Sequence, residues 1–544
     1  MQYILTENPS FNRDILFLFP DIEIKDYLKS PYRETECACL AEVDWNNTRL
    51  LICDAKKNCA KYEAITEKLE EETQYIWAEV FLSQLDSDFE KYETWMDNLI
   101  GKRKLAIWGV GNTWNDFKKI FAREPEIFID SNEKKDEKVV KPEEIQDWSE
   151  LFVIITSRFY DEISEELKKK GLEESQDYVS CFSFWGQIPL KPSKVVMDMQ
   201  EAKKYEDILC RDPFSVFKVI HNGGVYPCIC ESWIRSAGNI LEQSYDEIVH
   251  GIDYKLIQLS VINRTYYFCD KREGQCAYFD KTIYPNGVIM GRDDRNLKDT
   301  SKQVFIAFDK TCNLKCPSCR KDFIMEDETP HVESVRQAIE EKLLPEVEGA
   351  VMASAGEFFF SRQYKKLVAS DGFKNVKKLL IITNGILCNE ENWKELRQHY
   401  KGEVQLLVSI DAASEEVYRT IRKGSFQKLL EAMEYMKQLR RSGEISYWGI
   451  NYVIQQGNMS EIDKFIELGK RFEVDSIYFG CLRNWGTFEE EEFQDRDVFL
   501  TGTRQPGDVL AKIVAENQND REQIVNWFDI NGNFEIRGFY DNEW

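Results

Sequence analysis

Three cysteines in the stretch DKTCNLKCPSCRK (309–321) are the strongest chemical signal of the sequence. Cys312, Cys316 and Cys319 have the spacing C-x3-C-x2-C. Thiolates are soft ligands that suit zinc and iron–sulfur clusters. A closed zinc site needs four protein ligands, and a 4Fe-4S cube also has four corners. Three cysteines therefore fill three corners of a cube and leave one iron open to a ligand that the protein does not supply.

Six alternating strand–helix units have to position this loop. Their strands are short, nearly continuous apolar runs, which are typical of a parallel sheet covered on both faces. An open doubly wound sheet and a (β/α) barrel both gather active residues at the carboxyl ends of the strands. The cysteine loop follows the first strand, in that position. The expected strands are 304–309, 350–354, 379–383, 404–410, 447–454 and 476–479, and the expected helices lie near 332–343, after 361, around 393, from 426 and over 462–468.

The cysteine stretch resembles the signature of radical S-adenosylmethionine (SAM) enzymes. The resemblance implies an α/β fold with a partial (β/α)6 TIM-like barrel. It also implies that Cys312, Cys316 and Cys319 hold a 4Fe-4S cluster whose open iron binds the amino and carboxylate groups of SAM. Ser318 departs from the family, because many members carry an aromatic residue before the third cysteine.

Other strand ends extend the resemblance. The tetrapeptide Ala355-Gly356-Glu357-Phe358 resembles the Gly-Gly-Glu-Pro element that contacts the SAM amino group, although its first and last residues differ. Thr383-Asn384-Gly385 resembles a common family turn. The segment from Ser409 to Arg422, which includes Tyr418, resembles the region for the SAM ribose and carboxylate, and the segment 453–458 resembles the adenosine contact. The residues assigned to SAM in this way are Gly356, Glu357, Ser409, Asp411, Arg422, Ile454 and Asn458.

A second group of cysteines lies upstream of the barrel. The spacing Cys210-x12-Gly223-x4-Cys228 resembles the opening of SPASM-type domains, which carry auxiliary 4Fe-4S clusters. The glycine pair 223–224 favours a tight hairpin turn. SPASM domains usually follow the barrel, whereas this segment precedes it. A four-cysteine zinc site is the alternative. The expected ligands are Cys210, Cys228, Cys269 and Cys276, with Cys230 as a substitute.

The first two hundred residues resemble Rossmann-like domains. Residues 104–121 read as a strand, a glycine turn and a helix, and further strands end near 130 and 157. Trp114 occupies the third glycine position of the dinucleotide fingerprint, which leaves nucleotide binding open. Tyr62, Ile65 and Leu69 match Tyr160, Ile163 and Leu167 at an offset of 98, so residues 1–100 read as a degenerate copy; a chance match of two amphipathic helices is the alternative.

Composition bounds the remaining expectations. The net charge of −25 repels nucleic acid and anionic membranes, so neither is an expected partner. No signal peptide or membrane-spanning run is visible, so a cytoplasmic protein is expected, in which 15 cysteines are not a disulfide set. Proline-marked residues 187–200 read as a linker. The expected domains are 1–100 and 101–190 (Rossmann-like), 200–290 (SPASM-like), 301–482 (barrel) and 483–544 (tail).

The resemblance implies radical chemistry. A reduced cluster would cleave SAM to a 5′-deoxyadenosyl radical, which would take a hydrogen atom from a substrate carbon. The implied cofactors are two 4Fe-4S clusters and SAM, and the implied partner is an electron donor such as flavodoxin or ferredoxin. The Rossmann-like domains favour a sugar or small metabolite as substrate. The alternatives are a maturase of a ribosomally made peptide and a non-catalytic iron–sulfur or zinc protein.

Overall fold

In the computed structural model the chain forms two compact units. The first consists of Met1–Tyr205 with His250–Phe268, and the second of Glu206–Val249 with Cys269–Trp544. No helix in the described part of the chain is long and apolar enough to cross a bilayer. The described residues are 1–29, 37–118, 121, 123–130, 139–157, 160–181, 190–201, 205, 208, 210, 212–228, 236–269, 303–326, 328–352, 355–482, 487–498 and 524–526.

The second unit is built on one sheet with the strand order β12-β11-β10-β13-β14-β15-β16-β17-β18-β19. Strands β13 to β18 are parallel neighbours in chain order, as in a partial barrel. The sequence predicted these six strands to within a few residues at each end. Their bounds are β13 Gln303–Ala307, β14 Gly349–Met352, β15 Lys378–Thr383, β16 Glu403–Ser409, β17 Tyr447–Ile454 and β18 Ser476–Cys481.

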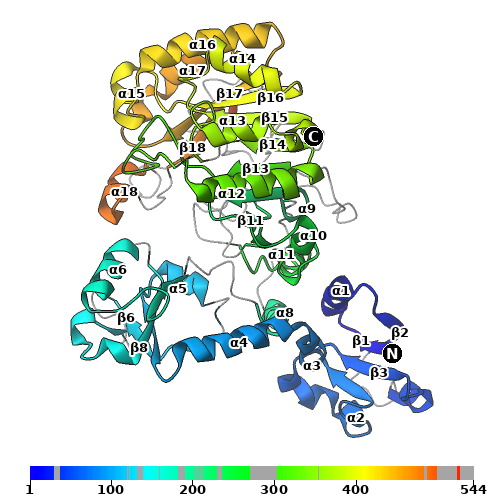
Figure 1. The fold of residues 1–544 in the computed structure, drawn as a ribbon. Coiled ribbons are helices and arrows are strands. Elements are labelled where there is room, and N and C mark those ends of the chain that lie inside the picture. Colours follow the sequence, from blue (N-terminus) through cyan, green and yellow to red (C-terminus); the bar gives the residue numbers. More distant parts are fainter. Residues whose placement is uncertain are drawn as a thin grey trace. The chain divides into compact units, whose positions relative to one another are not determined.

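Helices connect these strands (Figure 1). Most of them begin at a serine, threonine or asparagine whose side chain accepts a hydrogen bond from the first turn, as Ser361 does from Tyr364 N (3.0 Å). The helix expected at 332–343 begins at Pro330, and its α-helical part ends at Ala338, where a wider π-turn continues to Leu343. The helices are α12 Pro330–Ala338, α13 Arg362–Val368, α14 Glu390–His399, α15 Glu415–Ile421, α16 Phe426–Arg441 and α17 Ile462–Phe472.

One layer of the core extends from β10 to β18. Phe305, Val351 and Leu380 are register partners on β13, β14 and β15, and the other members are each offset from this register by two residues or more. The opposite face of the same strands is also buried, so both faces are covered, as the apolar runs predicted. The members of this layer are Val216, Phe305, Val351, Leu380, Leu407 and Tyr478.

A hairpin from the upstream cysteine segment belongs to this sheet. Strands β10 (Val216–Ile220) and β11 (Gly224–Tyr226) are antiparallel, which confirms the predicted hairpin. Gly223 has a φ of +80° and a Cβ there would lie 2.6 Å from the Asn239 side chain, so the turn needs glycine. β12 (Gly238–Asn239) pairs with β11, and β10 pairs in parallel with β13. The upstream segment therefore extends the barrel sheet directly. At the other edge, β19 (Ile524–Asn526) pairs with β18.

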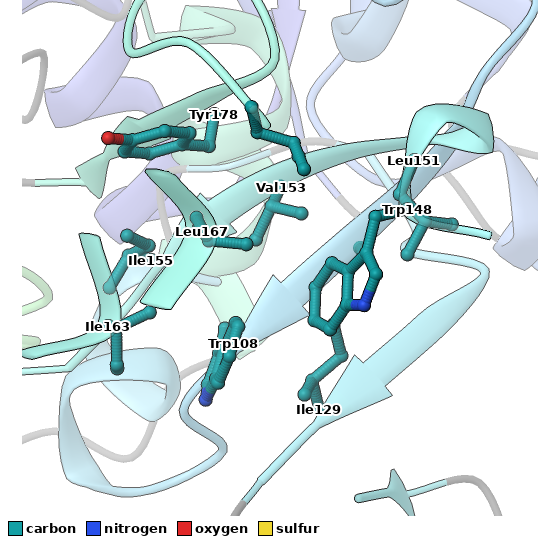
Figure 2. Packing of buried hydrophobic residues seen from close by; sticks show 11 residues of the cluster. Trp108, Ile129, Trp148, Leu151, Val153, Ile155, Ile163, Leu167 and Tyr178 are labelled. Carbon is teal, nitrogen blue, oxygen red and sulfur yellow. The ribbon is translucent and has the colours of Figure 1, made fainter. Parts of the chain in front are cut away.

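The first unit contains two parallel sheets. The sheet of residues 104–180 has the order β7-β6-β5-β8-β9. Its core packs the rings of Trp108 and Trp148 in a stack, with centroids 5.3 Å apart (Figure 2). Gly109 has a φ of +105° after β5, as its glycine turn requires. The strands are β5 Lys104–Trp108, β6 Ile127–Ile129, β7 Val139–Val140, β8 Leu151–Ile155 and β9 Tyr178–Ser180.

The sheet of residues 2–77 repeats this arrangement. Its order, β2-β1-β3-β4, matches β6-β5-β8-β9. Leu50 N donates to Gln74 O (2.9 Å), and Val153 N donates to Asp177 O (3.0 Å) in the equivalent place. The strands are β1 Gln2–Thr6, β2 Glu23–Leu28, β3 Thr48–Ile52 and β4 Tyr75–Trp77.

The two copies are related by a different offset from the predicted one. Thr48 and Leu151 begin equivalent strands 103 residues apart, whereas the matched helical tyrosines are 98 apart. The first copy has a longer loop before its helix α2 (Glu63–Thr66), which is shorter than α6 (Tyr160–Lys169). The shared strand order supports the internal repeat. The expected linker was partly wrong, because Pro192–Glu201 forms helix α8, whose Ser193 N–H bonds to Asp86 (3.0 Å).

Candidate active site

The cysteine loop is anchored at both ends immediately after β13. The Asp309 carboxylate accepts from Thr311 N (2.8 Å) and from the Ser361 hydroxyl at the start of α13. Cys312 N donates to Ile324 O (3.2 Å), and the Thr311 hydroxyl accepts from Glu326 N (2.9 Å). The loop conformation is therefore held by bonds within residues 309–326 and by one bond from Ser361, which is distant in the chain.

The three cysteine sulfurs face different surroundings. Cys312 and Cys316 are buried, whereas Cys319 is exposed. Leu314 N donates to Cys312 Sγ (3.4 Å), and Arg320 Nη2 donates to Cys319 Sγ (3.3 Å). In the described part of the chain, no three His, Cys, Asp or Glu side chains are grouped closely enough for a single metal ion. Burial raises the pKa of Cys312 to about 11 and also raises that of Cys316, so without a metal these thiols hold their protons.

Gly356 and Glu357 bind the cysteine loop to the end of β14. Gly356 has a φ of +76°, and a Cβ there would lie 2.4 Å from Asp309 O, so no other residue fits. Glu357 N donates to Thr311 O (2.9 Å). The Glu357 carboxylate is fully buried and accepts from the Thr383 hydroxyl (2.6 Å), Asn384 N (2.7 Å) and Phe359 N (3.2 Å). Burial raises its pKa, which these hydrogen bonds oppose.

A buried ion pair lies beyond β16. Asp411 has a φ of +61° and its carboxylate accepts from Arg422 Nη1 (3.0 Å) and from Val453 N (2.7 Å). Burial raises the pKa of Asp411, while Arg422 lowers it. Cys316 Sγ donates to the Arg422 carbonyl (3.5 Å), so the ion pair adjoins the second cysteine. This end of the sheet thus brings together a cysteine sulfur, a carboxylate and a guanidinium from three segments.

Two buried polar atoms beside this pair have no hydrogen-bond partner among the described residues. They are the hydroxyl of Tyr418, which is 0% exposed, and Nε of Arg422. Tyr418 Cε1, Leu314 Cδ2 and Ile386 Cδ1 all lie within 3.2 Å of the point where a Gly424 Cβ would stand. Leu314 and Ile386 in turn pack on Cys312 and Cys316. An unpaired buried polar atom costs about 1–3 kcal/mol, which a polar ligand would offset. The sulfur donors and these atoms fit a cluster with a polar ligand such as SAM.

The structure brings most of the predicted SAM residues to one end of the sheet. Ser409 and Ile454 are the last residues of β16 and β17. Asn458 is buried, and both hydrogens of its amide are donated to carbonyls, those of Asp411 (2.9 Å) and Val453 (2.9 Å). Asn458 therefore shapes the loop after β17 and has no amide hydrogen left for a ligand. The assignment of these residues to SAM stays a prediction.

Several residues that hold the site were not predicted from the sequence. Tyr364, on α13, contacts the carbonyls of Asp309 (2.9 Å) and Ala355 (2.8 Å) through its hydroxyl. Asn384 Nδ2 donates to the Asn313 side chain (2.8 Å). Arg320 Nη1 donates to Lys310 O (2.6 Å). The position of Arg320 next to the third cysteine was a usable signal, whereas the role of Tyr364 depends on tertiary packing.

The upstream cysteines come from segments that are far apart in the chain. Cys210 precedes β10, and Cys228 follows β11 by two residues. Lys218 pairs with Tyr226, so the same register continued by two residues puts Cys228 opposite Val216 at the open end of the hairpin. Cys228 and Cys269 are buried and Cys210 is partly exposed. Cys230 and Cys276 lie outside the described residues, so the ligand set stays a prediction.

Comparisons with known proteins support this arrangement. The family described as the radical SAM superfamily matches residues 307–469, and the SPASM family, an iron–sulfur cluster-binding domain, matches residues 210–277. No curated protein matches the chain. The fold and the cysteine loop define an iron–sulfur protein with a partial barrel. Residues 307–469 are therefore a radical SAM domain and residues 210–277 a SPASM-type domain, and the cofactors that these two domains imply are SAM and 4Fe-4S clusters.

Solved structures resemble parts of the chain. SuiB from Streptococcus suis bound to S-adenosylmethionine matches with 10% identity and a TM-score of 0.28, covering 42% of this chain and 47% of SuiB. SuiB bound to the precursor peptide SuiA matches with 13% identity and a TM-score of 0.29, covering 58% and 70%. The structure called anSMEcpe with bound AdoMet matches with 19% identity and a TM-score of 0.31, covering 41% and 61%. Similarity at this level carries nothing about the substrate of this chain.

Proposed function

We propose that Cys312, Cys316 and Cys319 hold the 4Fe-4S cluster at which the enzyme cleaves SAM reductively, and that hydrogen is then abstracted from a sugar or small metabolite. The observation that carries the proposal is the cysteine loop itself. The sulfurs of Cys312 and Cys316 are buried, and the loop adjoins the Glu357 carboxylate and the Asp411–Arg422 pair. Cluster and SAM, once bound, supply one-electron cleavage of SAM to a 5′-deoxyadenosyl radical.

The residues of the chain have separate tasks in this proposal. The N–H of Leu314 and the guanidinium of Arg320 stabilise thiolate charge on Cys312 and Cys319. Glu357 is held by three donors, which leaves one of its lone-pair positions for an ammonium group. Arg422 keeps Nε available for a carboxylate, while its Nη1 is fixed by Asp411. Burial of these groups keeps water away from the reacting atoms.

Anaerobic reconstitution tests the proposal. The purified chain should take up roughly eight irons, from two four-iron clusters. With SAM and a reductant it should release 5′-deoxyadenosine, and omission of the reductant should abolish the product. Iron-loaded protein that binds SAM without cleaving it would support the non-catalytic alternative. Zinc at the barrel cysteines would contradict both the cluster and its chemistry.

The auxiliary site is part of the same proposal. Cys210, Cys228, Cys269 and Cys276 are proposed to hold a second 4Fe-4S cluster, with Cys230 as a substitute. The hairpin supports it, because Cys228 and the segment from Cys210 lie at the same end of β10 and β11. A four-cysteine zinc site in this domain is the alternative. Metal analysis of a Cys312→Ala/Cys316→Ala/Cys319→Ala variant separates them, since only the upstream site remains to hold iron or zinc.

The substrate class needs its own experiment. The two Rossmann-like sheets favour a sugar or small metabolite, by resemblance to modules found beside carbohydrate-modifying enzymes. A ribosomally made peptide is the alternative. Candidates of either class with deuterium at their carbon-bound positions are incubated with enzyme and SAM. Deuterium in 5′-deoxyadenosine identifies the class, and a precursor-peptide gene or glycosyltransferase genes beside this one indicate which candidates to test first.

A further inference from the structure

The surface around Cys319 differs from the rest of the chain in charge. Residues 310–322 contain four basic residues and one acidic residue, the exposed Asp322, in a chain with a net charge of −25. Arg320 is buried and bonded to Cys319 Sγ (3.3 Å). Lys321 is exposed, and Lys310 and Lys315 are partly exposed. Among the described residues none of these three lysines has an ion-pair partner, so their positive charge faces solvent.

Two large apolar side chains lie exposed in the adjoining loop. Phe323 is 59% exposed and Met325 is 63% exposed. Their loop is fixed, because Ile324 O accepts from Cys312 N (3.2 Å) and Glu326 N donates to the Thr311 hydroxyl (2.9 Å). Lys315 Nζ lies 5.4 Å from the Phe323 ring centre, which joins the charged and apolar parts. Exposed apolar side chains bordered by charge are typical of a protein interaction surface.

This surface adjoins the exposed cysteine of the three proposed cluster ligands. Cys312 and Cys316 are buried, so the Cys319 side is where the site reaches solvent within the described residues. We propose that Lys310, Lys315, Lys321, Phe323 and Met325, the donor surface, bind an acidic one-electron carrier protein of the flavodoxin or ferredoxin type. In the complex the carrier loses one electron and the cluster gains it.

The positive charge and exposed apolar side chains of the donor surface suit a short-lived electron-transfer complex. Electron-transfer complexes are small and short-lived, and complementary charge raises their association rate. An acidic carrier would be repelled by the net charge of the chain and attracted at this basic surface, which favours the productive orientation. The inference rests on the proposed function, since it assumes a cluster at the three cysteines.

Charge reversal at the donor surface tests the inference. The variant Lys315→Glu/Lys321→Glu is compared with Lys428→Glu/Lys464→Glu, which makes the same charge change at exposed positions on α16 and α17. The reconstituted proteins are mixed anaerobically with reduced flavodoxin, and cluster reduction is followed by freeze-quench EPR. Parallel reactions use dithionite, a small anion, and reduced methyl viologen, a small cation.

The expected result is about tenfold slower reduction by flavodoxin in the donor-surface variant at low salt. Reduction by the two small reductants and iron content should match wild type. The flavodoxin rate of wild type should fall as salt rises, and that of the variant should change less. Phe323→Ser, which keeps every charge, should weaken flavodoxin binding without changing the salt dependence.

Other outcomes overturn the inference. Equal flavodoxin rates in both double variants would exclude this surface, and parallel loss with all three reductants would mean that the cluster itself is altered. Normal cluster reduction with lost product formation would assign the surface to substrate instead. A wild-type cluster that is reduced but releases no 5′-deoxyadenosine would contradict the proposed function alone, because the reduction rates still judge the docking surface.

Discussion

The two cysteine groups of this chain are built in different ways. The barrel group occupies eight residues, and its loop is fixed by bonds between residues 309 and 326 and by the adjoining β14 loop. The upstream group takes Cys210, Cys228 and Cys269 from separate segments, so the proposed auxiliary site requires a fold that brings distant parts of the chain together. A local site keeps its shape as long as one strand end is formed, whereas a distributed site depends on several long-range contacts.

The two cysteine groups also differ in what surrounds them. The barrel group sits where the Glu357 carboxylate and the Arg422 guanidinium converge. Cys210 and Cys228 flank a hairpin that shares the core layer of the barrel sheet through Val216. Loss of an upstream ligand is therefore expected to reach the barrel through the β10–β13 pairing and through the hydrogen bonds from Lys342 and His331 to main-chain carbonyls of the upstream segment. The following changes test whether the two groups are separable.

The largest effect is expected from Cys312→Ala. It removes one of three ligands from a site that has no spare cysteine in its loop, so SAM cleavage should be abolished and about half of the iron lost. Iron content and 5′-deoxyadenosine are measured after reconstitution. Cys59→Ala, the same change at an exposed cysteine in the first unit, is the control and should match wild type. Full iron in Cys312→Ala would contradict the cluster assignment.

Cys269→Ala should disrupt the proposed upstream cluster and leave the barrel cluster in place. About half of the iron should again be lost, while SAM cleavage stays measurable because the barrel loop is anchored independently. The measurements are iron content and 5′-deoxyadenosine per remaining cluster. Unchanged iron would remove Cys269 from the ligand set, and complete loss of cleavage would show that the two groups are coupled through the sheet.

The sequence predicted the local features of this molecule well. The six barrel strands could be located because each is a continuous apolar run, and the heptad-like spacing of Leu429, Met433 and Met436 marked the buried face of α16. The upstream hairpin followed from its glycine pair. These features depend on residues close in the chain, where periodicity and turn chemistry are informative.

Features that depend on distant residues were missed. Nothing in the run 216–220 indicates that it pairs with β13 more than eighty residues later. The sequence also did not show that both amide hydrogens of Asn458 are donated to main-chain carbonyls, which the folded loop brings near; its assignment to SAM stays a prediction. The repeat was detected at the helices, but loop and helix lengths changed the offset at the strands, which a fixed-offset comparison does not follow.

Glu357→Gln sharpens the assignment of the barrel site. The amide places a donor where the carboxylate accepts from Thr383 and Asn384, and it removes the charge that would hold the SAM ammonium. SAM affinity should fall about 10- to 100-fold with iron content unchanged. Equilibrium binding of SAM to reconstituted protein measures it. Glu403→Gln, at the opposite end of β16, is the control. Unchanged affinity would assign Glu357 to loop structure only.

The smallest effect is expected from two tyrosine variants, which should change the free energy of unfolding in opposite directions. Tyr418 has a buried hydroxyl without a partner, whereas the Tyr364 hydroxyl contacts the carbonyls of Asp309 and Ala355. In protein without cofactors, Tyr418→Phe should raise the free energy of unfolding by about 1 kcal/mol, because it removes an unsatisfied polar group, and Tyr364→Phe should lower it by about 1–3 kcal/mol.

In protein loaded with cluster and SAM, Tyr418→Phe should be unfavourable instead of stabilising, whereas Tyr364→Phe should be unfavourable in both states. If its hydroxyl is kept for the bound group, Tyr418→Phe should weaken SAM binding several-fold, the equivalent of about 1 kcal/mol for one hydrogen bond. Denaturant titration and SAM binding, both under anaerobic conditions, give the two numbers. A Tyr418→Phe variant that is stabilised in both states would mean that the hydroxyl is a packing defect. The opposite signs would instead identify it as part of a site that is complete only when its ligand is bound.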